Sequence, residues 1–341
     1  MKIKAPIGIK HKSLWTELRR AFLRNREYLN TSETWFINIY NGIGDAFIVL
    51  GLLKSFREYH NAKYIVVVLR KGLLPIANLF KTSYDDALVL DKDYPREPKE
   101  RYDFYPNELI LSSKPFVHQA DWRDLVQSNN IPHLDWYKYG LRLPMKMPFQ
   151  NPQFNTNIEA VKINELKLKK NKSVILFPYT NFGTRIRDET WIQIIKILHS
   201  RDFTVYTNCK NSSFDKEAEE KFNNNSVSGD NHRPLPETIP LDVELDNLWG
   251  ILEYCNFGIF AGGGLSLVSA YTKANILVIQ PNKIIEGEKL NSRFAQKTFT
   301  ALQVCGSIKV AAPDRSNLTE ILDDDLLIAK LEQFLKNGNG D

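Results

Sequence analysis

The feature that most restricts the fold of this chain is an alternation of short apolar segments with longer amphipathic ones. In the first half, the segments WFINIY (35–40) and KYIVVVL (63–69) are strand-like, and residues 45–60 between them have apolar side chains at helical intervals. A continuous β-branched run such as KYIVVVL is typical of a strand buried on both faces of a parallel sheet. The alternation therefore predicts an α/β fold with right-handed crossovers.

The same alternation restarts in the second half of the chain. Strands are expected at 173–179 and in FTVYTN, FGIFA and NILVIQP, and helices are expected at 157–168, 189–202, 245–256 and in LSLVSAYTKA. A closing helix is expected over NLTEILDDDLLIAKLEQFLKN. Two consecutive units of this kind predict two Rossmann-like domains.

The boundary between the two units is expected in PMKMPFQNPQFNT (144–156), which has three prolines and no acidic residue and is typical of a linker. A length of 341 residues also exceeds the usual size of one core. We therefore predict domains at residues 1–150 and 151–341, with a final helix that could cross back to the first domain.

Charge and cysteine content narrow the classes of function. The net charge of +5 is too mild to indicate nucleic acid binding. The first 26 residues are strongly basic, and Trp15, Leu18 and Phe22 fall at helical spacing among the charges. Such a helix is expected either to lie on an anionic membrane surface or to pack on the domain by one stripe. The three cysteines form no CxxC, so neither a disulfide framework nor a zinc site is expected.

The segment NGIGDAF places Asn41, Gly42, Gly44 and Asp45 where the first strand passes into a helix. The dinucleotide fingerprint requires a third small residue at the position of Phe47, so binding of NAD or FAD is not expected. Asp45 lies at the positive end of the expected helix, where a carboxylate can accept a proton from a bound hydroxyl. Aspartate is also a favoured helix cap, and these residues alone favour capping.

A second candidate segment is FPYTNFGTRIRDETW (177–191). It follows a predicted strand and carries Thr180, Asn181, Arg185 and Arg187. Arginines beside hydroxyl groups at the carboxyl end of a strand suit an anionic phosphate group. A solvated loop before a capped helix is the equally simple alternative.

A third candidate is AGGGLSLVSA (261–270), where Gly262, Gly263 and Gly264 join a buried strand to a helix whose first turn contains Ser266. Backbone amides at such a helix start can bind a diphosphate without any side-chain charge. The alternative is a tight crossover that needs positive φ. Three consecutive glycines are more than such a crossover needs, which favours a functional turn.

Two weaker patterns lie between these segments. LDKDY contains Asp91 and Asp93, the spacing with which metal-dependent glycosyltransferases hold a divalent ion, although this spacing is common by chance. His118 and His133 flank an aromatic, polar region (118–137) that could line an acceptor pocket. No His/Asp metal cluster is evident, and no metal is expected.

The three loops, in this order on two similar halves, resemble the heptosyltransferase-like glycosyltransferases of family 9, which have the GT-B fold. The likeness covers most of residues 35–282 and is carried by NGIGDAFIVLGLLKSFRE, HLDWYKYGLRLP, VILFPYTNFGTRIRDETW and LDNLWGILEYCNFGIFAGGGLSLVSAYTKANILVIQP. The resemblance implies an α/β protein whose two Rossmann-like domains face each other across a cleft. It also implies a nucleoside-diphosphate sugar as co-substrate, with no metal or other cofactor.

Individual residues follow from the resemblance. Asp45 corresponds to the catalytic base of the family, and Arg185 or Arg187 to the basic residue that contacts the donor phosphate. Gly264 corresponds to the glycine beside the donor diphosphate. From the motifs themselves, Asn41, Gly42, Gly44 and His118 are expected on the acceptor side or in the glycine loop, and Thr180, Asn181, Gly262, Gly263 and Ser266 are expected on the donor side.

The chain also departs from the family pattern. The aspartate and threonine of the family's D-T-G are Gly262 and Gly263 here, and the following histidine is Leu267. Those family residues help to recognise the sugar-nucleotide in the heptose enzymes. The resemblance therefore does not identify ADP-heptose as the donor of this chain.

The function expected from the resemblance is inverting sugar transfer to a cell-surface glycan or a lipid-linked acceptor, with Asp45 as general base. The basic N-terminus fits a cytoplasmic enzyme that is peripheral at the inner face of the membrane. Two alternatives stay open: a GT-B-type sugar-nucleotide epimerase, and a non-catalytic glycan-binding or nucleotide-binding relative. An epimerase would form product without an acceptor, whereas a binding protein would not even hydrolyse the donor.

Overall fold

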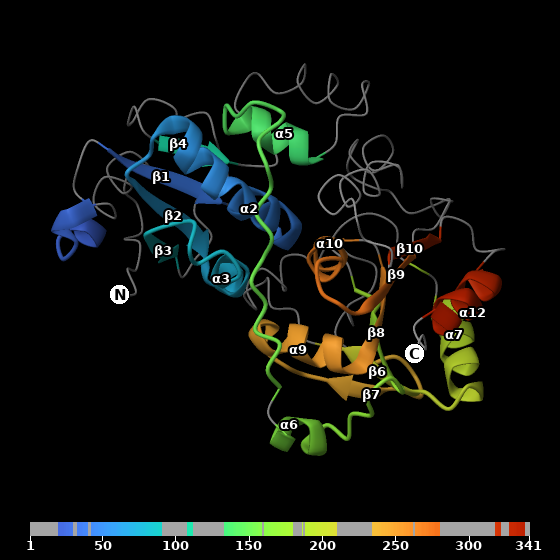
Figure 1. Cartoon of the computed structure of the whole chain (residues 1–341). Helices are drawn as coiled ribbons and strands as arrows, with labels where there is room; N and C mark the ends of the chain where they lie inside the picture. Colours follow the sequence, from blue (N-terminus) through green and yellow to red (C-terminus); the bar gives the residue numbers. More distant parts are fainter. Residues whose placement is uncertain are drawn as a thin grey trace, which may run out of the picture. The chain divides into compact units, whose positions relative to one another are not determined.

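The protein folds into two compact units, Met1–Gln153 and Phe154–Asp341. A computed structural model describes residues 20–29, 33–39, 42–90, 108–111, 133–158, 160–179, 186, 188–209, 234–261, 263–279, 318–321 and 327–337. Each unit contains one parallel β-sheet with helices in its crossovers (Figure 1). The division falls three residues after the predicted boundary at 150.

The first unit contains a four-stranded sheet in the order β3-β2-β1-β4. Its strands are β1 (Thr34–Ile39), β2 (Tyr64–Arg70), β3 (Asp86–Leu90) and β4 (Glu108–Leu111). Its helices are η1 (Glu27–Leu29), α2 (Ile43–His60), η2 (Lys71–Leu73), α3 (Leu74–Asn78) and α5 (His133–Gly140). The strands predicted at 35–40 and 63–69 are confirmed, each displaced by one residue.

Helix α2 crosses from β1 to β2 and is nearly covered by the rest of the first unit. Its apolar positions, among them Phe47, Leu50 and Phe56, are fully buried. The helix ends at Asn61, which adopts the left-handed conformation (φ 50°) and whose N–H donates to the carbonyl of Arg57. Asparagine is one of the few residues besides glycine that adopt this conformation readily.

The proline-rich segment before the domain boundary is fixed along α2. The ring of Phe149 packs against Gly51 so closely that a Cβ atom on residue 51 would lie only 2.2 Å from it. The N–H of Gln150 donates to the carbonyl of Gly51 at 2.8 Å, and the hydroxyl of Ser55 donates to the carbonyl of Pro148 at 2.6 Å. The predicted linker is therefore part of the packing of the first unit up to this point.

The second unit contains a six-stranded parallel sheet in the order β10-β9-β8-β5-β6-β7. Its strands are β5 (Ser173–Phe177), β6 (Thr204–Asn208), β7 (Ile239–Leu241), β8 (Asn256–Ala261), β9 (Asn275–Ile279) and β10 (Leu318–Ile321). Its helices are α6 (Ala160–Glu165), α7 (Asp188–Ser200), α9 (Leu245–Cys255), α10 (Gly264–Ser269) and α12 (Leu327–Asn337). This strand order is that of a complete Rossmann sheet.

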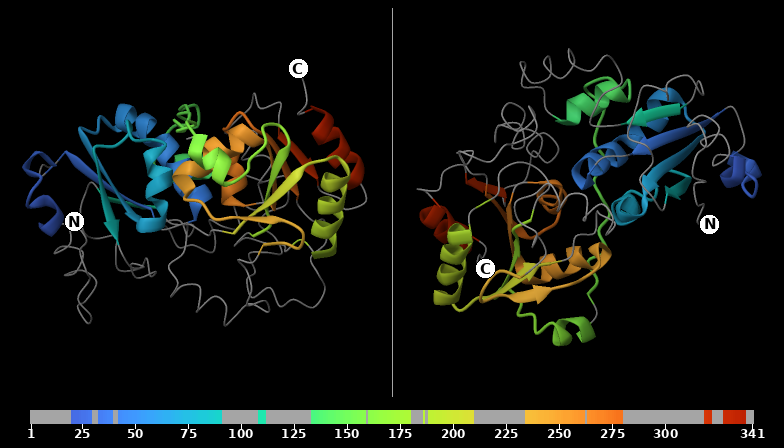
Figure 2. Two further views of the ribbon diagram at one scale, coloured as in Figure 1. Left: turned by 90° about the horizontal axis from the view of Figure 1, so that it is seen from below. Right: turned by 180° about the vertical axis from the view of Figure 1, so that it is seen from behind.

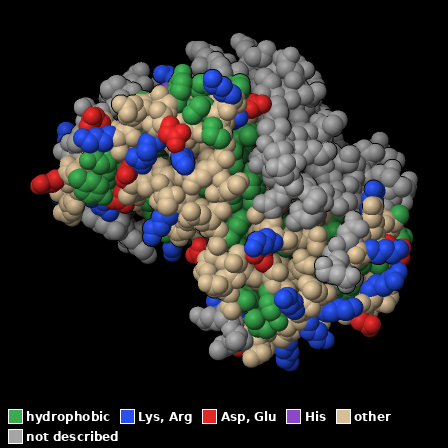
Figure 3. Space-filling model, in the orientation of Figure 1, with side chains coloured by type: hydrophobic (Ala, Val, Ile, Leu, Met, Phe, Trp, Pro, Cys, Tyr) green, Lys and Arg blue, Asp and Glu red, His purple; other side chains and the backbone are tan. Residues whose placement is uncertain are grey.

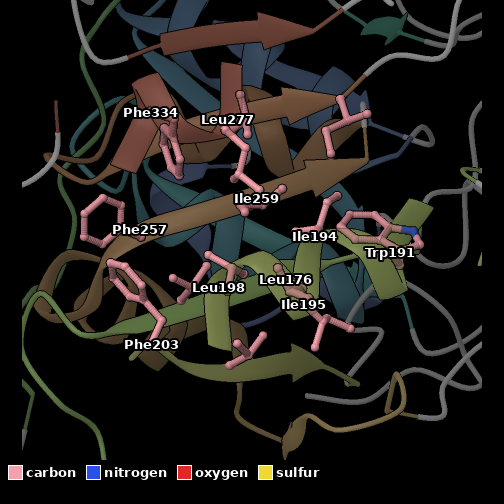
Figure 4. Packing of buried hydrophobic residues seen from close by; sticks show 14 of the residues in the cluster. Leu176, Trp191, Ile194, Ile195, Leu198, Phe203, Phe257, Ile259, Leu277 and Phe334 are labelled. Carbon is pink, nitrogen blue, oxygen red and sulfur yellow. The ribbon is translucent and has the colours of Figure 1, made fainter. Parts of the chain in front are cut away.

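Helices cover both faces of the second sheet (Figures 1 and 2). On one face, α7 contributes Trp191, Ile194, Ile195 and Leu198 to the core, as the helical spacing predicts, and α12 packs beside it (Figure 4). On the other face, α9 lies against β5 and β8. Alternate strand residues point to opposite faces, so each buried strand serves both layers.

The end of the chain differs from the prediction of one closing helix. Residues 318–321 form strand β10, which pairs in parallel with β9 so that Leu318 lies opposite Ile276. The described helix that follows is α12 (Leu327–Asn337). Pairing with a neighbouring strand overrides the helical pattern of this segment, because it satisfies the backbone groups beside an existing sheet edge.

The last helix belongs to the core of the second unit, although it was predicted to be able to cross back to the first. Leu331 is fully buried in α12, and the ring of Phe334 meets that of Phe257 edge-on, with ring centroids 5.5 Å apart. The apolar stripe of the helix is thus used against β8 and β9. Within the described parts of the chain, no helix combines the length and apolarity needed to cross a membrane.

Candidate functional site

The best-defined candidate site of the first unit lies where β1 passes into α2. Strand β1 has β2 as its neighbour on one side and β4 on the other. The direction in which successive strands are added to the sheet therefore reverses at β1. In open parallel sheets, ligands bind beyond the carboxyl ends of the strands at such a reversal. Asp45 follows β1 directly and lies in the first turn of α2.

Asp45 is not the helix cap that the sequence alone favoured. The N-cap is Gly42, with φ −68° and ψ 177°, and Asp45 occupies the third helical position. Its carboxylate accepts a hydrogen bond from the backbone N–H of Gly42. This is the reciprocal contact that an acidic residue makes at the third position of a capping box. The side chain thus supports the turn from within the helix.

Tyr137 is a functional candidate that the sequence motifs do not identify. Its phenol donates to Oδ1 of Asp45 at 2.7 Å, and the tyrosine side chain is buried on α5. The two residues are 92 positions apart in sequence. The signals in the sequence are that Tyr137 ends the aromatic region predicted to line an acceptor pocket and lies in HLDWYKYGLRLP, one of the segments that carry the resemblance.

The surroundings of Asp45 change its acidity. Burial of the half-buried carboxyl raises its pKa from 3.8 to about 6, and the hydrogen bonds from Tyr137 and Gly42 oppose this rise. A carboxyl group with this pKa is largely ionised at neutral pH and is still a stronger base than an ordinary aspartate. Such a shift is typical of functional sites.

The second candidate site lies in the second unit at the ends of β5 and β8. These strands are neighbours although they are far apart in sequence, with Phe177 opposite Phe260. Their two rings stack with centroids 3.9 Å apart. The strand order also reverses here, between β5 and β8. The fold therefore brings together the starting points of the two loops predicted to bind the donor.

The glycine turn after β8 has a defined local structure. Gly263 is extended, with φ 174°, so this position does not need the positive φ of the alternative interpretation. The N–H of Gly263 donates to Oγ of Ser266 at 3.2 Å, and the Ser266 hydroxyl donates back to the carbonyl of Gly263 at 2.7 Å. Ser266 is buried, and its hydroxyl caps the start of α10 within the turn.

Other predicted site residues lie outside the described residues: Asn41, Asp91, Asp93, His118, Thr180, Asn181, Arg185, Arg187 and Gly262. Gly44 is described and lies in the first turn of α2, and Gly264 begins α10. In the described ranges, no group of three or more His, Cys, Asp or Glu side chains could hold a metal ion.

Comparisons with known proteins follow the fold rather than the sequence. Neither a protein-family model nor a curated protein matches this chain. Among solved structures, Escherichia coli ADP-heptose LPS heptosyltransferase II matches with a TM-score of 0.53 and 12% identity, over 90% of this chain and 100% of the other. A family 9 glycosyl transferase from Veillonella parvula matches with a TM-score of 0.53 and 10% identity, over 89% and 97%.

A third similar structure is the dodecameric iron-containing heptosyltransferase TibC in complex with ADP-D-β-D-heptose. It matches with a TM-score of 0.51 and 12% identity, over 89% of this chain and 76% of the other. At such low identity these matches establish the fold. They confirm the predicted α/β class with two Rossmann-like domains of the GT-B type. The resemblance to heptosyltransferase-like glycosyltransferases of family 9 is confirmed at the same level.

Proposed function

We propose that the protein is a glycosyltransferase that moves a sugar from a nucleoside-diphosphate sugar to a glycan or lipid-linked acceptor. The observation that carries the proposal is the carboxylate of Asp45, which combines a place beyond the carboxyl end of β1 with a pKa raised to about 6. A general base needs both features: access to a bound ligand and a pKa near the working pH. The transfer inverts the anomeric centre and uses no metal.

In the proposed reaction, Asp45 removes the proton of the acceptor hydroxyl as its oxygen attacks the anomeric carbon. The bond from that carbon to the diphosphate breaks on the opposite face, and the nucleoside diphosphate leaves with the bonding electron pair. Asp45 ends the step protonated and then releases the proton to water. No covalent intermediate with the enzyme is formed.

The second unit is proposed to hold the leaving diphosphate. Arg185 or Arg187 would offset its growing negative charge, together with the backbone amides of residues 264–266 at the start of α10. The first amides of a helix have no partner within the helix and are free to meet an anion. The described contacts of Ser266 support this turn as a rigid framework, because the serine holds Gly263 from both its N–H and its carbonyl.

The donor is best identified first by binding. ADP-, GDP-, UDP-, TDP- and CMP-sugars are compared in a thermal-shift assay, with ADP-heptose included because TibC was solved with that ligand. A ligand that binds only the folded state raises the melting temperature. No shift with any nucleoside-diphosphate sugar would overturn the proposed donor class.

With the donor that binds, Asp45→Asn is expected to lower kcat by at least about a hundredfold while the donor-induced thermal shift is kept. Asp202→Asn, in an exposed turn of the second unit, is the matched control and should turn over normally. Near-normal turnover of Asp45→Asn would contradict the assignment of the base. Product formed without an acceptor would favour an epimerase, and donor binding without even slow hydrolysis would favour a binding protein.

A further inference from the structure

The carboxylate of Asp45 is held by a partner from a different helix. We infer that Tyr137 is a positioning residue for Asp45: its phenol binds Oδ1 and fixes the carboxylate in one orientation at the start of α2. The catalytic meaning of this contact rests on the proposed function. The contact itself can be tested on the protein alone.

Helix α5 presents Tyr137 from a firmly attached position. Lys138, which is buried beside Tyr137, donates to the carbonyl of Met145 at 2.6 Å and lies 3.6 Å from the carboxylate of Asp135. His60, at the end of α2, contacts the carbonyl of Leu141 at 2.9 Å. The contact of His60 ties the chain at the end of α5 to α2, the helix that carries Asp45, and so helps to keep Tyr137 beside Asp45.

The two helices carry few other groups that could set the charge of Asp45. The titratable side chains of α5 besides Tyr137 are His133, Asp135, Lys138 and Tyr139. Of these, Asp135 and Lys138 form an ion pair with each other. On α2 the next ionisable residue after Asp45 is Lys54, more than two turns away. The helix α3 and the strand β1, which also pack on α2, have no titratable side chain.

A phenol that donates to a carboxylate stabilises the ionised form. Burial acts in the opposite direction on Asp45, so the carboxylate remains ionised at neutral pH partly because Tyr137 donates to it. A hydrogen bond to a charged group corresponds to roughly one pH unit or more of titration midpoint. Removing the phenol oxygen should therefore leave the packing of the ring in place and make Asp45 easier to protonate.

The test is an NMR titration of protein labelled with ¹³C at the aspartate carboxyl carbons. The Asp45 signal is assigned by its loss in Asp45→Asn. In Tyr137→Phe the titration midpoint should rise by about one pH unit. Tyr206→Phe is the matched control, because Tyr206 is equally buried and donates to the carbonyl of Leu166 in the second unit. An unchanged or lowered midpoint in Tyr137→Phe would overturn the inference.

A second variant covers the case in which Tyr137→Phe does not fold. Site-specific replacement of Tyr137 by 3-fluorotyrosine keeps the hydroxyl and makes it more acidic, which strengthens its donated hydrogen bond. The midpoint of Asp45 should then fall below that of the unmodified protein. A rise, or no change, would contradict the inference, since a purely structural tyrosine has no reason to move the titration downward.

The inference and the proposed function can fail separately. If transfer is observed, Tyr137→Phe should lower kcat/KM about threefold at pH 6.5 and recover by pH 8.5, as expected when a base of pKa about 6 shifts to about 7. The donor-induced thermal shift should not change. A shifted midpoint with normal turnover of Asp45→Asn would retain the Tyr137 contact and reject the base. An unshifted midpoint together with an inactive Asp45→Asn variant would reject the Tyr137 contact and retain Asp45 as the base.

Discussion

At the scale of single residues, the acidity of Asp45 links the site to the stability of the protein. The folded state binds the proton of this carboxyl more tightly than the unfolded chain does, because the pKa rises from 3.8 to about 6. This contribution to stability is fully present below about pH 4 and is lost as the pH rises through about 6. The loss amounts to at most about 3 kcal/mol.

Replacing Asp45 by Asn should therefore stabilise the protein more at pH 8 than at pH 4.5. The variant has no carboxylate to leave poorly solvated at high pH, whereas at low pH the wild-type group is protonated as well. The measurement is the difference in melting temperature between variant and wild type at the two pH values. Asp202→Asn, which removes an exposed carboxylate at a position where asparagine tolerates the φ of 61°, is the matched control. A stabilisation by Asp45→Asn that is equal at both pH values would contradict this account.

At the scale of elements, Gly51 shows how packing reverses a local preference. Within a helix, Gly→Ala normally stabilises by up to about 1 kcal/mol. In α2, however, the new Cβ would lie 2.2 Å from the ring of Phe149. The ring or the helix must move, at a cost of about 1–3 kcal/mol. Gly51→Ala is therefore expected to lower the melting temperature of the protein.

The same substitution should have the opposite effect once the ring is removed. In the background of Phe149→Ala, nothing of the ring meets the Cβ of residue 51, and the ordinary helical preference of alanine should return. The measurement is a double-mutant cycle of melting temperatures. Additive effects of the two substitutions would show that Gly51 and Phe149 do not interact as described.

At the scale of the whole molecule, the two units repeat one plan. In each unit, the strand that comes first in the sequence lies inside the sheet, and the strand order reverses beside it. Strand β1 lies between β2 and β4, and β5 lies between β6 and β8. Asp45 follows the first of these strands, and the predicted phosphate-binding loop follows the second. The two halves of the proposed reaction thus use the same position of the same sheet topology.

Attachment to an anionic membrane is also a proposal for the whole molecule, through its basic N-terminal segment. Lys and Arg side chains lie on the surfaces of both units (Figure 3), so net charge alone does not locate the contact. The test replaces Lys2, Lys4, Lys10 and Lys12 by Gln and uses vesicles that contain about 30% of the anionic lipid phosphatidylglycerol. Binding to these vesicles should weaken by at least about tenfold, because each lysine near an anionic surface contributes about 1 kcal/mol.

The control for this prediction changes the same charge elsewhere. Lys167, Lys169, Lys170 and Lys172 are exposed on the second unit, and their replacement by Gln should leave vesicle binding nearly unchanged. Sedimentation with the vesicles measures both variants. Equal losses would indicate general attraction by charge and would contradict a specific N-terminal contact.

Much of the strand pattern could be predicted from short segments. YIVVVL, SVILF and NILVI lie in strands of the structure, and the helical spacing of Trp191, Ile194 and Leu198 identifies the buried face of α7. LTEI (318–321) was assigned to a helix and is a strand, and α10 ends at Ser269 before the predicted helix does. In both cases the local pattern is ambiguous, and contacts with the neighbouring sheet decide the outcome.

The candidate site divides in the same way. A glycine turn, an aspartate at a helix start and a second glycine turn can be recognised in a single sequence, because a turn or a helix start depends on residues close to one another. The contact of Tyr137 with Asp45 spans 92 positions, and the ring of Phe149 beside Gly51 comes from the end of the first unit. Burial, strand pairing and the pKa of about 6 exist only when such distant residues meet, so they were decided by tertiary structure.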